Sequence, residues 1–144
     1  MVGVRRLSEE LLAEGHTVRI NARGRSMYPV IAGGDSVTVR LPLDLAPGDL
    51  VVYKRHGELV CHRLVSLTGG ADPVPQCLTW GDALLEPDRP VPVDRIVGKV
   101  VTIERGRVSP SRRLLLLAQP VLKAGRLNAA VVSLLSGLWA LLAR

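Results

Sequence analysis

Alternating apolar and polar residues indicate short β-strands through most of the first hundred positions. The stretch DSVTVRL at 35–41 is typical, because Val37, Val39 and Leu41 alternate with polar residues, as on a strand with one buried face. The same pattern, bounded by Gly, Pro and Asp, predicts about seven strands in all. They are expected at 16–20, 35–41, 49–54, 58–67, 76–80, 93–104 and 106–109.

The segments between these strands read as turns, loops and one short helix. LSEELLAEG at 7–15 predicts a helix that ends at Gly15, RHG at 55–57 predicts a hairpin turn, and TGGADPVPQ at 68–76 predicts an exposed loop. Short strands with Gly and Pro between them are typical of a small coiled sheet. We therefore expect a mostly β, barrel-like domain with a short N-terminal helix.

The pattern becomes helical after position 108, which predicts a β domain at 1–108 and an apolar helical tail at 109–144. The stretch Leu127–Ala143 carries no charged residue, although it is slightly shorter than the ~20 residues that span a bilayer. Two interpretations remain open. The tail packs on the β domain or on a second copy of the chain, or it sits in a membrane.

Basic residues before the tail bear on where the protein works. Arg112, Arg113, Lys123 and Arg126 precede the uncharged stretch, and only Arg144 follows it. If the stretch spans a membrane, this bias keeps the β domain on the cytoplasmic side. We expect a membrane-associated protein at the cytoplasmic face, with a soluble cytoplasmic protein as the alternative; the oligomeric state stays open.

Composition narrows the function classes. The chain has 144 residues, 47% of them hydrophobic but only 3% aromatic, with no Phe, so Val and Leu must fill the core. So few aromatic residues argue against a base-stacking surface. The net charge of +6 is spread over single and paired basic residues, which favours acidic partners or anionic lipid. It does not form the cluster of basic residues that is typical of nucleic-acid-binding proteins. We expect no nucleic-acid partner.

The cysteines and histidines show no metal-binding spacing. Cys61 and Cys77 are the only cysteines, and they are expected to be buried thiols; the sequence leaves open whether they are bonded to each other. We expect neither a metal nor an organic cofactor.

A candidate nucleophile lies in GRSMYPVI at 24–31, where Ser26 stands among turn-forming residues. A serine in such a place is usually a turn or cap residue, and a nucleophile needs a base. Of the three histidines, His16 and His56 lie in polar surroundings, whereas His62 lies inside the predicted strand at 58–67. The alternation of that strand puts His62 on one face with Val60 and Leu64.

Two carboxylates that follow Trp80 could orient His62. Asp82 lies directly after Gly81, and Asp88 follows six positions later. A carboxylate that accepts from one ring nitrogen would fix the tautomer and stabilise the imidazolium ion, as in Ser-His-Asp enzymes. The sequence leaves open which of the two does so.

Five blocks in this order resemble the signal peptidase I superfamily, across about residues 20–103. The likeness is to its Ser/His branch, found in the endoplasmic-reticulum signal peptidase and in archaeal and sporulating-bacterial relatives. The blocks are GRSMYPVIAGGDSV, PGDLVVYK, VCHRLV, LTWGDALLEPDRPV and IVGKV. The resemblance implies that Ser26 is the nucleophile, that His62 takes the place of the usual bacterial Lys, and that Asp82 and Asp88 are the acidic residues.

The chain departs from this family at two places. Charges interrupt residues 1–20, where the family usually has a membrane anchor, and Gly24 replaces a hydroxyl residue that assists the oxyanion in the Ser/Lys enzymes. The oxyanion is then expected to rest on backbone N–H groups, chiefly that of Ser26.

Self-cleaving repressors share this type of β domain, but they use Lys and carry an Ala–Gly cleavage bond before the serine. No Ala–Gly pair precedes Ser26 here, and Lys54, the other candidate base, lies in a predicted strand end beside a charged turn. We therefore expect a serine endopeptidase that binds a peptide or protein as an extended strand and cleaves it next to small residues. The alternative is an inactive binding or regulatory module with the same fold.

Overall fold

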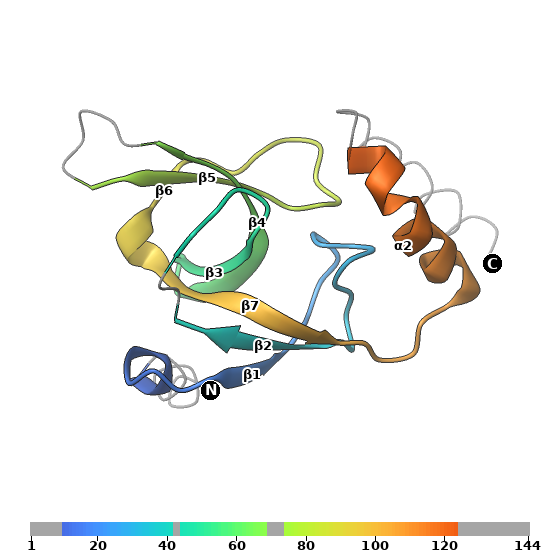
Figure 1. Cartoon of the computed structure of the whole chain (residues 1–144), viewed down its shortest axis with the longest axis horizontal. Coiled ribbons are helices and arrows are strands. Elements are labelled where there is room, and N and C mark those ends of the chain that lie inside the picture. The colour runs from blue at the N-terminus through green and yellow to red at the C-terminus, as the bar shows by residue number, and fades with distance from the viewer. Residues whose placement is uncertain (1–9, 42–43, 69–73, 124–144) are drawn as a thin grey trace.

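The computed structural model describes residues 10–41, 44–68 and 74–123, and it consists mainly of one coiled antiparallel sheet (Figure 1). The strand order is β1-β2-β7-β3-β4-β5-β6. The mostly β fold is therefore confirmed, although the described strands form an open sheet with β1 and β6 at its two ends rather than a closed barrel. The strands are β1 (Val18–Asn21), β2 (Ser36–Arg40), β3 (Leu50–Arg55), β4 (Glu58–Thr68), β5 (Gln76–Trp80), β6 (Val91–Pro92) and β7 (Ile96–Glu104).

Six of the predicted strands are present, but the strand predicted at 106–109 is wrong. These residues form no strand, because the Gly106 amide donates to the Asp35 carboxylate at 2.9 Å rather than to a neighbouring strand. The seventh strand is instead β6, which pairs with β5 through Val91 opposite Cys77. β6 was not predicted because it has two residues, one of them proline, and so short a strand shows no alternation of apolar and polar residues.

The hairpin of β3 and β4 forms at the predicted turn. His56 and Gly57 connect the strands with φ of 49° and 77°, which is the conformation of a two-residue hairpin turn that matches strand twist. The register places Val51 opposite His62 and Tyr53 opposite Val60. Tyr53 and His62 are therefore diagonal neighbours on one face of the sheet.

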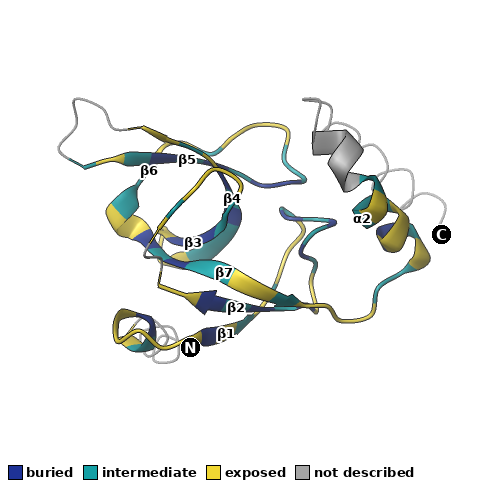
Figure 2. Cartoon of the chain, viewed as in Figure 1, coloured by how far each residue is buried: buried dark blue, intermediate teal, exposed yellow. Residues whose placement is uncertain are grey.

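Two clusters of buried apolar side chains fill the domain. Figure 2 marks the buried residues of the chain in dark blue. One contains Met27 and Ile31, which follow Ser26 on its loop, together with Val37 and Val39 of β2. The other contains Tyr53 of β3 and Leu64 of β4. The first cluster thus holds the loop of Ser26 in place, and the second holds the strand of His62.

The C-terminal helix α2 (Pro110–Lys123) begins at a capped turn. Pro110 stands at the first helical position, where its missing N–H costs nothing, and the Ser109 hydroxyl accepts from the Arg112 amide at 3.2 Å. The boundary predicted at 108/109 falls just before this helix. The predicted tail nevertheless contacts the sheet domain through Arg112.

Arg112 is buried in the sheet domain, with 4% of its surface exposed. Its guanidinium forms a two-pronged ion pair with Asp35, and it also donates to the carbonyl oxygens of Pro29, at 2.9 Å, and Val30, at 3.3 Å. Asp35 accepts in addition from the amides of Ala32 and Gly106. This pair fastens α2 to the loop that carries Ser26.

The tail predicted to reach a membrane, Leu127–Ala143, lies outside the described residues. None of the helices in the described ranges has the length and apolarity of a membrane span. Membrane association therefore stays a prediction.

We predict that Arg112→Ala lowers the free energy of unfolding by about 3–5 kcal/mol, because it leaves the Asp35 carboxylate buried without its counter-charge. Arg113→Ala is the matched control: this exposed neighbour should change stability by less than about 0.5 kcal/mol. Urea denaturation measures both variants. Equal effects of the two substitutions would contradict the account.

The same pair makes stability depend on pH. Burial tends to raise the pKa of Asp35, but the Arg112 guanidinium and the two amides hold it below its ordinary value of 3.8. The ionised pair therefore stabilises the fold above pH ~4, and this contribution is lost as the pH falls through the lower folded-state pKa. In Asp35→Asn, stability should fall less between pH 5 and pH 3 than in the wild type.

Candidate functional site

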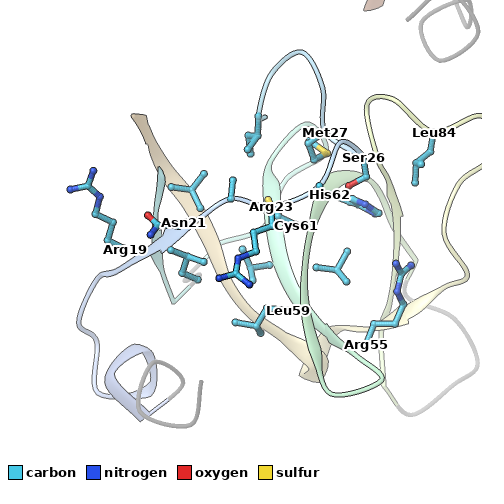
Figure 3. Close-up of a pocket in the computed structure, with 17 residues that line it drawn as sticks. Arg19, Asn21, Arg23, Ser26, Met27, Arg55, Leu59, Cys61, His62 and Leu84 are labelled. Carbon is cyan, nitrogen blue, oxygen red and sulfur yellow. The ribbon is translucent and has the colours of Figure 1, made fainter. Parts of the chain in front are cut away.

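The loop that carries Ser26, residues 22–35 between β1 and β2, is called the serine loop here. This loop and strand β4 border one cavity of about 700 Å³. Ser26 and His62 both line it, and Figure 3 shows the Ser26 hydroxyl beside the His62 ring. The two candidates for nucleophile and base, 36 positions apart in the sequence, are thus brought together. The lining of the cavity also includes the apolar side chains of Met27, Ile31 and Val52.

The loop after β5 fixes the backbone at Ser26. The amide of Ala83 donates to the Ser26 carbonyl oxygen at 2.8 Å. Gly81 approaches so closely that a Cβ atom at that position would lie 2.7 Å from the same oxygen. The glycine before Asp82 is therefore needed for the contact between this loop and the serine loop.

His62 is 1% exposed, and its Nδ1 atom contacts Asp88. The distance from Nδ1 to Oδ2 of Asp88 is 2.5 Å, and the Tyr53 hydroxyl oxygen lies 3.3 Å from the same nitrogen. An ionised carboxylate can only accept. Nδ1 therefore carries the hydrogen in the neutral ring, and Nε2 keeps its lone pair.

Asp88 is itself held from three sides. Its amide donates to the Thr79 carbonyl oxygen, and its carboxylate accepts from the Thr79 hydroxyl at 2.9 Å and from Arg55 at 3.0 Å. Burial tends to raise the pKa of Asp88, but the hydrogen bonds and charge of its partners, His62 first, lower it below 3.8. Asp88 therefore stays ionised where an ordinary histidine titrates, near pH 6.5.

Asp82, the other predicted carboxylate, contacts a different side chain. Arg63 donates to its two oxygens at 2.8 and 2.7 Å and to the Gly48 carbonyl oxygen at 2.8 Å. Neighbouring residues on a strand point to opposite faces, so Arg63 takes Asp82 while His62 takes Asp88. The structure thus separates two acidic residues that the sequence left equivalent.

Tyr53 and Thr79 complete the buried polar network, and the sequence analysis missed both. Burial, followed by the charge of Asp88, raises the pKa of Tyr53 to about 12 against the lowering effect of the Thr79 hydrogen bond, so its hydroxyl stays protonated. Alternation predicted that Tyr53 and Thr79 belong to strands. It could not show that their hydroxyl groups reach the same carboxylate.

Cys61 also lines the cavity, next to His62 in sequence. Burial, and to a lesser degree the charge of Asp82, raises its thiol pKa to about 12. The thiolate is the nucleophilic form of cysteine, so Cys61 is a poor nucleophile at neutral pH. Cys61 and Cys77 are free thiols; Cys77 is buried, as expected, and Cys61 is half-buried.

Comparison with known proteins gives a family for this arrangement. A search of curated protein sequences found no match. The family model described as Peptidase S24-like matches residues 3–74, half of the chain, and this range contains both Ser26 and His62. The chain therefore belongs to the Peptidase S24-like family, whose name places it among the serine peptidases.

Proposed function

We propose that the protein is a serine endopeptidase in which Ser26 is the nucleophile, His62 the general base and acid, and Asp88 the residue that orients His62. The observation that carries the proposal is the hydrogen bond from His62 Nδ1 to Asp88, beside Ser26 in one cavity. It leaves Nε2 as the ring atom that can accept a proton. This is the arrangement of roles in Ser-His-Asp enzymes.

In the proposed reaction, Nε2 of His62 takes the proton of Ser26 as its oxygen attacks a peptide carbonyl. The imidazolium ion, stabilised by Asp88, then gives the proton to the leaving amine, and water releases the acyl group by the same steps. Within the described ranges, the amide of Ser26 donates to no protein acceptor. That N–H group is our candidate donor to the oxyanion, and such a donor is typically worth about 3 kcal/mol of barrier.

The unpaired edges of two strands suggest how a peptide binds. Among the described residues, β1 pairs only with β2, and β4 pairs with β5 only from Arg63 onward. The segments 19–24 and 59–62 both line the cavity. We propose that an extended substrate adds to these edges by main-chain hydrogen bonds, and that it is cut next to small residues, as the resemblance to signal peptidases implies.

His62 distinguishes this site from the Ser/Lys type. Lys54, the other candidate base, lies on β3 with its side chain exposed, and it does not line the cavity.

The first test removes each member of the dyad. Ser26→Ala and His62→Ala should each lower kcat for an accepted peptide by about 10⁴-fold or more, and the double variant should be little worse, because the two act as a unit. Thermal melts check that both variants are folded. Full activity of folded His62→Ala would contradict the assignment, and a folded wild type that cleaves nothing would favour the inactive module.

The second test separates the two carboxylates. Asp88→Asn should lower kcat by about 10²–10⁴-fold, because an amide can hold the ring in the wrong tautomer. Asp82→Asn is the matched control, because it makes the same change at a residue bound to Arg63. It should lower the free energy of unfolding, and it should lower kcat much less than Asp88→Asn does. Steady-state rates and urea denaturation of both variants decide between them. A larger loss of kcat in Asp82→Asn would assign the orienting role to Asp82.

A further inference from the structure

The charged side chains that line the cavity are all of one sign. Among the residues that the structure describes, they are Arg19, Arg23 and Arg55, and none of the described Asp or Glu side chains lines the cavity. Apolar walls strengthen the field of charges that border a cleft. The cavity is therefore suited to a substrate that carries negative charge.

Two of these arginines already have acidic partners. A guanidinium nitrogen of Arg19 lies 2.5 Å from a carboxylate oxygen of Glu104, and one of Arg55 lies 3.0 Å from a carboxylate oxygen of Asp88. Arg23 is exposed and forms neither a hydrogen bond nor an ion pair with any residue that the structure describes. Figure 3 shows its side chain extending from the serine loop toward Leu59 of β4.

The position of Arg23 limits which part of a substrate it can reach. It precedes Ser26 by three residues, and consecutive Cα atoms are 3.8 Å apart, so the two Cα atoms lie within ~11 Å. An extended peptide advances ~3.3 Å per residue. A substrate side chain that meets Arg23 therefore lies within about four residues of the bond that Ser26 would cleave.

We propose that Arg23 is a specificity residue that binds an Asp or Glu side chain of the substrate within about four residues of the cleaved bond. This inference rests on the proposed peptidase function. A guanidinium binds a carboxylate through two parallel hydrogen bonds. A substrate side chain that ends in a neutral amide or an ammonium group cannot form this pair. Alternate side chains of the same extended peptide would face the apolar part of the lining, which includes Met27 and Ile31.

The test uses ten-residue peptides with alanines at the centre and a single Asp, Asn or Lys at each of four positions on either side. At one position, the wild type should cleave the Asp peptide about tenfold faster in kcat/KM than the Asn peptide, and the Lys peptide more slowly still. Arg23→Gln should abolish the difference, and Arg23→Glu should favour Lys. Higher salt should reduce the preference.

Arg40→Gln is the matched control. It removes the same charge from an exposed residue of β2 that does not line the cavity, and it should leave the preference for Asp unchanged. Equal cleavage of Asp and Asn peptides by the wild type at all positions, or the same preference in Arg23→Gln, would overturn the inference.

A binding measurement separates this inference from the proposed reaction. Fluorescence anisotropy with labelled peptides and Ser26→Ala requires no hydrolysis, and it should again show tighter binding of the Asp peptide. If the wild type cleaves nothing but this preference is present and Arg23→Gln removes it, the inference stands and the peptidase proposal fails. If cleavage occurs with no preference for an acidic residue, the inference fails and the peptidase proposal stands.

Discussion

The hydrogen bond between His62 and Asp88 is the interaction on which the site depends. A histidine on the buried face of a strand must satisfy its ring nitrogens, because an unpaired buried polar group costs about 1–3 kcal/mol. Asp88 meets this need at Nδ1, which leaves Nε2 as the ring nitrogen that can act in the proposed reaction. The loop from Gly81 to Asp88 must therefore return to β5, where Thr79 binds both the amide and the carboxylate of Asp88.

The serine loop is held from two directions, and both contacts join segments far apart in the sequence. On one side, Gly81 and Ala83 approach the Ser26 carbonyl oxygen. On the other, Arg112 of α2 binds Asp35 and two carbonyl oxygens of the loop. A side chain on an otherwise irregular segment, such as that of Ser26, can be kept in a fixed position by such contacts. These contacts also explain why the sequence blocks contain Gly81, which leaves room for the Ser26 carbonyl oxygen, and Asp35, which binds Arg112.

Much of the fold was predictable, because a strand with one buried face alternates in sequence. The strands around Val37, Val52 and His62, and the turn at His56, follow from local patterns. β6 was missed because two residues carry no period, and the strand predicted at 106–109 failed because Gly106 bonds to Asp35. Resemblance brought Ser26 and His62 together as candidates, and in the structure they line one cavity.

What could not be predicted depends on where chains cross in space. Asp82 and Asp88 are equivalent in sequence, and only the path of the loop gives one to Arg63 and the other to His62. Arg112 looked like one more basic residue at the start of a tail, although it is buried beside Asp35. The central claim is that Ser26 is an activated nucleophile. It is tested most directly by a fluorophosphonate, which modifies serines only where a base activates them. The account predicts a single adduct at Ser26 by peptide mapping, formed in the wild type and lost in folded His62→Ala. No adduct on the folded wild type, or equal modification in His62→Ala, would contradict it.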